Sequence, residues 1–241
     1  MTYKNNILFL KIFMVSALAI VVFCGRPGTA RPDLEKAGAQ TGEKAEDVSA
    51  VEDLMREHGL LDRILLIYDK VLRDTETGPA PSCGVLFKAA SITRDFMENY
   101  HEKLEEDYVF PRLEKTGPLT DLVKVLREQH QAGRRLTGVI LEISKPGEID
   151  RPSGLPRLRN ALRSFVAMYR PHKAREDTTL FPALHANISQ KEYAELGGQF
   201  EAREHQLFGR DGFENMVRAV GQLEQELNIY NLAGFTPKIE N

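Results

Sequence analysis

Apolar residues recur every three to four positions along most of the chain, which places them on one face of a helix. In the first such segment, from Ser49 to about Arg73, Leu54, Leu61 and Leu65 form one stripe. Further segments of this kind, separated by loops rich in glycine and proline, are expected over about 83–113, 119–144, 155–184, 189–209 and 213–227. The pattern predicts an all-α fold, an antiparallel up-down bundle of four long helices with two extra C-terminal helices.

Side chains that bind metals interrupt the apolar stripes of the second and fourth helices. His101 and Glu105 are four residues apart in HEKLEEDYVFPRL, so both project from one helix face. The stretch recurs 71 residues later as HKAREDTTLFPAL, where His172 and Glu176 have the same spacing. A Phe-Pro-x-Leu string follows each pair at the same offset. Two copies in one register are hard to attribute to chance.

One histidine precedes each pair by a similar distance, which extends the repeat to a two-helix unit. His58 lies 43 residues before His101, and His130 lies 42 residues before His172. Folding one unit against its copy brings four imidazoles and two carboxylates into the interior. Such a buried polar set is costly unless something binds it. Four nitrogens and two carboxylates suit iron, with manganese or zinc as alternatives.

This motif set resembles that of the hemerythrin-like (HHE cation-binding) family over about residues 49–235. The resemblance implies a non-haem di-iron centre in a four-helix bundle, with both glutamates bridging. The two iron ions would be held by His58, His101, Glu105, His130, His172 and Glu176. Oxygen-carrying hemerythrins differ, because they have a second histidine where this chain has Arg134, and because their last ligand is an aspartate at the fifth position after the histidine, whereas the resemblance assigns Glu176 at the fourth position here. These departures argue against reversible oxygen transport.

Two carboxylates are candidates to replace the missing ligand. Glu102 follows His101, and this His-Glu-x-x-Glu string resembles the hemerythrin-like domain of an iron-sensing F-box protein. The alternative for Glu102 is a solvated carboxylate on the helix face. Glu204 shares a stripe with Phe200 and Leu207, where a carboxylate needs a partner. Glu204 is therefore a candidate ligand or a group that supports one.

The resemblance implies a protein that binds, senses or detoxifies a small oxidant, namely oxygen, nitric oxide or peroxide. The alternatives are iron storage or sensing, and a purely structural metal site without turnover. Peroxidase, catalase-like or nitrogen-oxide-handling turnover remains open, and a proton relay through Tyr108 or Tyr169 would favour it. Gly133, near His130, indicates either a path for a small ligand or close helix packing. The sequence names no catalytic residue.

The first thirty residues have the organisation of a signal peptide. Lys4 and Lys11 precede a short apolar run, and small residues precede a cleavage site after Ala30. The run is shorter than the ~20 residues of a membrane-spanning helix. Residues 1–30 are therefore expected to direct export to the periplasm or envelope.

Two alternatives attach the protein to the membrane, namely an uncleaved anchor through residues 7–23 and a lipid on Cys24. Contact with a membrane is expected only through this segment. Residues 31–48 form a polar linker, 49–235 the hemerythrin-like domain and 236–241 a C-terminal tail. The formal net charge of −3 indicates no nucleic-acid partner.

Export has a direct test. Protein isolated from its native envelope fraction is expected to begin at Arg31, because the signal is removed after Ala30. Intact-mass spectrometry measures this. An intact Met1 on cytoplasmic protein would contradict export, and a lipid adduct on Cys24 would favour the anchored alternative.

Overall fold

The computed structural model describes residues 49–78 and 82–239, and all regular secondary structure in that part is helical. The all-α prediction is therefore confirmed for these residues. None of the described helices combines the length and the apolar character that a membrane span requires. Residues 1–48, to which the sequence assigns the signal and the linker, lie outside the described part.

Four long helical rods are followed by two shorter helices. The first and third rods are α1 (Ala50–Thr77) and α5 (Thr120–Ile143). The second rod comprises α2 (Cys83–Ile92), η1 (Thr93–His101), α3 (Glu102–Leu104), η2 (Glu105–Val109) and α4 (Phe110–Thr116). The fourth comprises α6 (Gly154–Arg175), η3 (Glu176–Leu180) and α7 (Phe181–Asn187). After them come α8 (Gln190–Phe208), α9 (Gly212–Glu226) and the short η4 (Leu232–Phe235).

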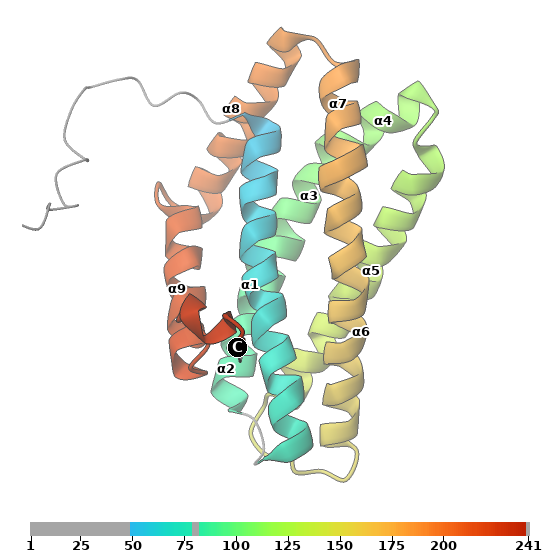
Figure 1. Ribbon diagram of the computed structural model, residues 1–241. Coiled ribbons are helices and arrows are strands. Elements are labelled where there is room, and N and C mark those ends of the chain that lie inside the picture. Colours follow the sequence, from blue (N-terminus) through green and yellow to red (C-terminus); the bar gives the residue numbers. More distant parts are fainter. Residues whose placement is uncertain (1–48, 79–81, 240–241) are drawn as a thin grey trace, which may run out of the picture. The chain divides into compact units, whose positions relative to one another are not determined.

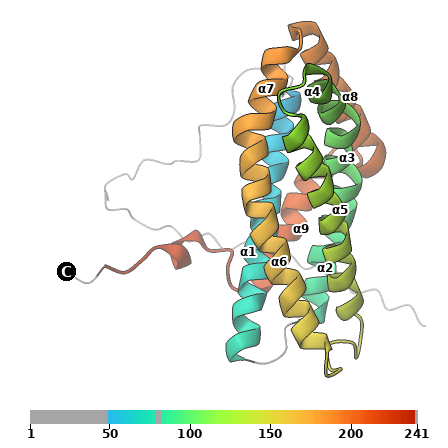
Figure 2. The same ribbon diagram turned by 90° about the vertical axis from the view of Figure 1, so that its right-hand side faces the viewer.

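The rods contact one another in a ring. α1 packs against α6, α6 against α5, α5 against α2 and η1, and η1 against α1 (Figure 1). Apolar side chains fill the interior, and in one such contact the rings of Tyr68 and Phe165 meet edge to face at 5.3 Å. Figure 2 shows the same rods from the side. α8 and α9 cover α1 from outside the ring, and α9 also contacts α2.

Both copies of the sequence repeat pass from α-helix into a π-helical turn at the glutamate. η2 begins at Glu105 and η3 at Glu176, and each is a π-helical turn. The N–H of Phe110 donates to the Glu105 carbonyl, and that of Phe181 to the Glu176 carbonyl, five residues back. The proline after each phenylalanine has no N–H and crowds the carbonyl four residues earlier, which a wider turn accommodates. The Phe-Pro strings thus mark a widened turn at each glutamate.

Gly133 marks a very close approach between α5 and α6. A Cβ atom placed there would overlap the Tyr169 hydroxyl and lie 2.7 Å from the ring carbon that bears it. Tyr169 is buried, and its ring packs on Phe165 at a centroid distance of 4.3 Å. Of the two sequence-based interpretations of Gly133, close helix packing is therefore the correct one, and a tyrosine fills the space.

Replacing Gly133 by alanine is expected to lower the free energy of unfolding by about 1–3 kcal/mol, because the buried Tyr169 ring must shift. Gly59 in α1 is a matched control, since nothing lies within 4 Å of a Cβ atom there. Gly59→Ala should raise the free energy of unfolding by up to about 1 kcal/mol, as alanine is the better helix former. Urea unfolding measures both variants. If Gly133→Ala is as stable as the parent, Tyr169 moves aside freely.

Candidate metal centre

Each of the four rods contributes one histidine to a common interior cluster. The four residues are His58 of α1, His101 of η1, His130 of α5 and His172 of α6, and each is at most 4% exposed. The Nε2 atoms of His58 and His101 are 3.1 Å apart. The rings of His130 and His172 lie 5.0 Å apart between centroids. The histidines therefore form two pairs.

Glu105 lies between the two histidine pairs and faces both. Its Oε1 is 3.6 Å from His101 Nε2, and its Oε2 is 3.4 Å from His130 Nε2. The side chain is fully buried. One carboxylate oxygen is thus directed at each pair, as a ligand that bridges two metal ions requires.

Glu176 occupies the equivalent place from the other repeat unit. Its Oε2 is 3.4 Å from His58 Nε2, and its Oε1 is 3.1 Å from His172 Nε2. Oε1 also lies 4.0 Å from His130 Nε2. Like Glu105, the side chain is fully buried and spans both pairs.

The carboxylate oxygens at the centre of the cluster have no hydrogen-bond donor within the described part of the chain. All four carboxylate oxygens of Glu105 and Glu176, and His130 Nε2, lack a hydrogen-bond partner among the described residues. Buried acceptors left in this state are costly. The possible ligands form two groups, and within each group the ligand atoms lie within 4.8 Å of one another. One group is His58, His101 and Glu105, and the other is His130, His172 and Glu176. Imidazole and carboxylate ligands of this number fit a pair of transition-metal ions.

The outward nitrogen of every histidine meets a hydrogen-bond acceptor. The Nδ1 contacts are His58 to Asp177 (2.7 Å), His101 to Glu57 (2.7 Å), His130 to Glu106 (3.1 Å) and His172 to Gln129 (2.8 Å). An acceptor at Nδ1 holds the proton there and leaves Nε2 free to bind a metal. All four rings are therefore oriented with Nε2 towards the interior.

These four acceptors are functional candidates that the sequence analysis missed, although the repeat contains a signal for them. Glu106 and Asp177 each follow the glutamate of a His-x-x-x-Glu pair. Glu57 and Gln129 each precede the first histidine of a unit. Each acceptor thus neighbours a candidate ligand in sequence but bonds the histidine of a different rod, which only the packing of the rods reveals.

The phenylalanines of the two Phe-Pro strings cover the cluster. Phe110 stacks on His130 with a centroid distance of 5.4 Å, and Phe181 stacks on His58 at 5.5 Å. Both phenylalanines are fully buried. Each string therefore supplies an apolar wall against a histidine of the other repeat unit, which excludes water from one side of that ring.

Protons and charges in the cluster are coupled. Burial, and then repulsion from Glu176, raise the pKa of Glu105 well above its usual range. Burial opposes the charge on His58, but the hydrogen bond to Asp177 and the nearby carboxylate of Glu176 outweigh this effect and raise the pKa of His58 to about 9. Burial lowers the pKa of His130 to about 4, so this ring is neutral near neutral pH. Without metal, the cluster therefore holds protons on Glu105 and His58 that a cation would displace.

The structure places the two further carboxylate candidates differently. Glu102 is only 2% exposed, so it is not a solvated carboxylate, and it forms a third group of possible ligands with Glu106 and His130. Glu204 belongs to none of the three groups of possible ligands. Its Oε1 accepts the backbone N–H of Phe213 at 2.6 Å, because the short turn after α8 sets the start of α9 beside it. The carboxylate of Glu204 is therefore satisfied by a backbone N–H in the first turn of α9, which it caps.

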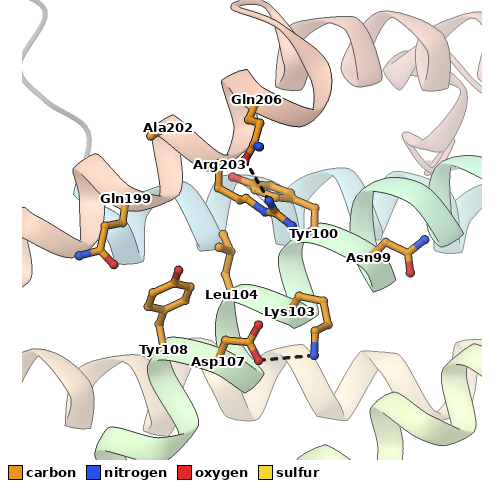
Figure 3. Close-up of a pocket in the computed structure, with 10 residues that line it drawn as sticks. All are labelled: Asn99, Tyr100, Lys103, Leu104, Asp107, Tyr108, Gln199, Ala202, Arg203 and Gln206. Atoms are coloured by element: carbon orange, nitrogen blue, oxygen red, sulfur yellow. Dashed lines mark hydrogen bonds and ion pairs between the residues drawn. The ribbon is translucent and has the colours of Figure 1, made fainter.

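An open groove of about 660 Å³ runs between the second rod and α8 (Figure 3). It is lined by Asn99, Tyr100, Lys103, Leu104, Asp107 and Tyr108, and by Gln199, Ala202, Arg203 and Gln206 of α8. None of the six clustered histidines and glutamates lines it. Tyr108 belongs to this groove, whereas the ring of Tyr169 lies 5.4 Å from that of His172. Of the two tyrosines considered for a proton relay, Tyr169 touches the cluster.

Comparison with known proteins agrees with this site. The hemerythrin HHE cation-binding domain matches residues 49–184, which include all six clustered residues. An uncharacterized protein of Mycobacterium bovis and two of Mycobacterium tuberculosis are 43% identical to the chain over 212 residues, 88% of this chain and 80% of each relative. No solved structure matches the chain significantly. The chain belongs to the hemerythrin HHE cation-binding family.

Proposed function

We propose that this protein holds a non-haem di-iron centre and uses it to bind, sense or detoxify a small oxidant such as oxygen, nitric oxide or peroxide. One observation carries the proposal. Two fully buried glutamates each turn one oxygen towards each of two histidine pairs, and these oxygens have no hydrogen-bond donor among the described residues. Family membership supports a cation at this place.

The ligand set divides between two metal ions. One ion would be held by His58 and His101, and the other by His130 and His172, with Glu105 and Glu176 bridging. Two six-coordinate ions offer about twelve positions, of which the side chains and a shared solvent ligand fill about ten. About one position on each ion is therefore left for a small ligand. Iron, when bound, would supply the electrons for chemistry with an oxidant.

The arrangement of the helices and the N-terminal sequence bear on the fold and on the location of the protein. We infer that the four rods form the antiparallel up-down bundle of the family, with α8 and α9 as additions to it. We further propose that the protein acts in the periplasm or envelope after export through residues 1–30, or anchored by residues 7–23 or Cys24. The basic start and the short apolar run of this segment support the proposal.

A metal site without turnover is the second candidate, and one observation favours it. All six clustered residues are at most 4% exposed, and the groove beside α8 does not reach them. A closed site of this kind would stabilise the fold or store iron. The response of the bound metal to an added small ligand separates the two candidates.

Iron content tests the proposal directly. Protein reconstituted with ferrous iron under anaerobic conditions is expected to hold about two irons per chain. His101→Ala and His172→Ala should each lose at least one and lower the stability, because removing a ligand leaves the buried carboxylates unneutralised. His205→Ala is the matched control, since His205 lies exposed on α8. Parent protein that retains no iron in metal analysis would contradict the central proposal.

Metal binding is expected to release protons and to strengthen as pH rises from neutral towards about 9. Burial and Glu176 raise the pKa of Glu105, and the carboxylates around His58 raise its pKa to about 9, so both groups hold protons that a metal must displace. Titration of weakly buffered metal-free protein with Mn²⁺ and a pH indicator measures the release. Glu105→Gln should release about one proton fewer. Binding without proton release would contradict this account.

A further inference from the structure

Arg134 places a cation beside the proposed metal centre, one turn after His130 in α5. Its Nη2 lies 2.9 Å from Glu102 Oε2, and its Nη1 lies 2.8 Å from Glu106 Oε1. Nη2 also donates to the Glu98 carbonyl at 3.3 Å. These contacts all reach the second rod, so the guanidinium ties α5 to the side chains that follow His101 and Glu105.

Glu102 is held from two sides. Its Oε1 accepts a hydrogen bond of 2.6 Å from the Tyr169 hydroxyl, and its Oε2 is paired with Arg134. Tyr169 keeps its position because Gly133 has no side chain to displace the hydroxyl. Gly133, Arg134 and Tyr169 together therefore form a clamp on Glu102, which we call the Glu102 clamp.

Glu102 lies within reach of the metal centre. One of its oxygens is within 4.8 Å of a ring nitrogen of His130 and of a Glu106 oxygen. Tyr169, its hydrogen-bond donor, touches the ring of His172. The carboxylate thus lies beside His130 and His172, the pair that would hold one ion, and carboxylate oxygen is a ligand that such an ion accepts.

We propose that Arg134 and Tyr169 hold Glu102 off the metal and so keep one coordination position on the His130 and His172 side open for a small ligand. The inference rests on the proposed di-iron centre. Arg134 is in this account a positioning residue, because it acts through Glu102. Without the guanidinium, the buried carboxylate loses its counter-ion, and the metal becomes the cation nearest to it.

Azide binding to the oxidised di-iron protein tests the clamp, with the shift of the charge-transfer absorption as readout. The parent is expected to respond to azide. Arg134→Gln should keep its iron but need at least about tenfold more azide, because the buried Glu102 carboxylate loses its ion pair and competes for the metal. Tyr169→Phe removes the other restraint and should weaken azide binding in the same direction. Arg134→Lys retains the charge and should stay closer to the parent than Arg134→Gln.

Rescue separates positioning from a structural role. In the double variant Arg134→Gln with Glu102→Gln, the competing carboxylate is gone, so azide binding should return to the parent level. The inference is overturned if iron-loaded parent ignores azide, if Arg134→Gln binds azide like the parent, or if the double variant stays weak. Loss of iron in Arg134→Gln would also overturn it, since Arg134 would then build the site. Iron content of the parent reports separately on the proposed di-iron centre.

Discussion

Two buried carboxylates that accept no hydrogen bond from the residues the structure describes impose the constraint on which the rest of this structure depends. Glu105 and Glu176 lie in the interior, and burial of two such charges side by side is strongly unfavourable in the absence of a cation. The surrounding histidines offset the charge of Glu176 only, since His172 and His58 lower its pKa in spite of burial, whereas His130 is neutral and its Nε2 has no hydrogen-bond partner among the described residues. The proposed pair of metal ions would satisfy the oxygens and the Nε2 atoms together, and metal binding would then contribute to the folding free energy.

The repeat explains how four separate rods present such a site with precision. Each unit supplies one histidine, one His-x-x-x-Glu pair and one Phe-Pro string. Acceptors within a unit orient His101 and His172, whereas Asp177 and Glu106 reach across to orient His58 and His130 of the other unit. The stacked phenylalanines also reach across. Loss of one rod would therefore misplace ligands on its neighbours as well as its own.

Further acidic side chains, which are not among the six proposed ligands, lie between the second rod and α5 and also need cations. Glu98, Glu102 and Glu106 succeed one another at intervals of four residues on the second rod, and the first two are buried. Arg94 pairs with Glu98 at 3.0 Å, and Arg134 pairs with the other two. The two arginines offset a column of acids beside the proposed metal centre. In that proposal, an open metal position would depend on a guanidinium that is not itself a ligand.

Sequence alone determined the helical class and the six residues that meet in the interior, because both follow from spacing along one chain. Apolar periodicity locates helices, and a duplicated His-x-x-x-Glu needs no tertiary information to be recognised. Helix ends were less well determined. The first helix continues to Thr77 rather than Arg73, since nothing before Gly78 breaks it. The second and fourth rods each extend three residues beyond the predicted ends.

Tertiary structure decided every contact that joins distant parts of the chain. Asp177 bonds His58 across 119 residues, and Tyr169 bonds Glu102 across 67. No local sequence pattern encodes which helices face each other. The sequence therefore indicates Glu204 as a possible ligand, whereas in the structure its carboxylate accepts the backbone N–H of Phe213 at the start of α9. The physical reason is that spacing along a helix orients side chains on that helix, whereas the partner of a buried polar group is chosen by the packing of the rods.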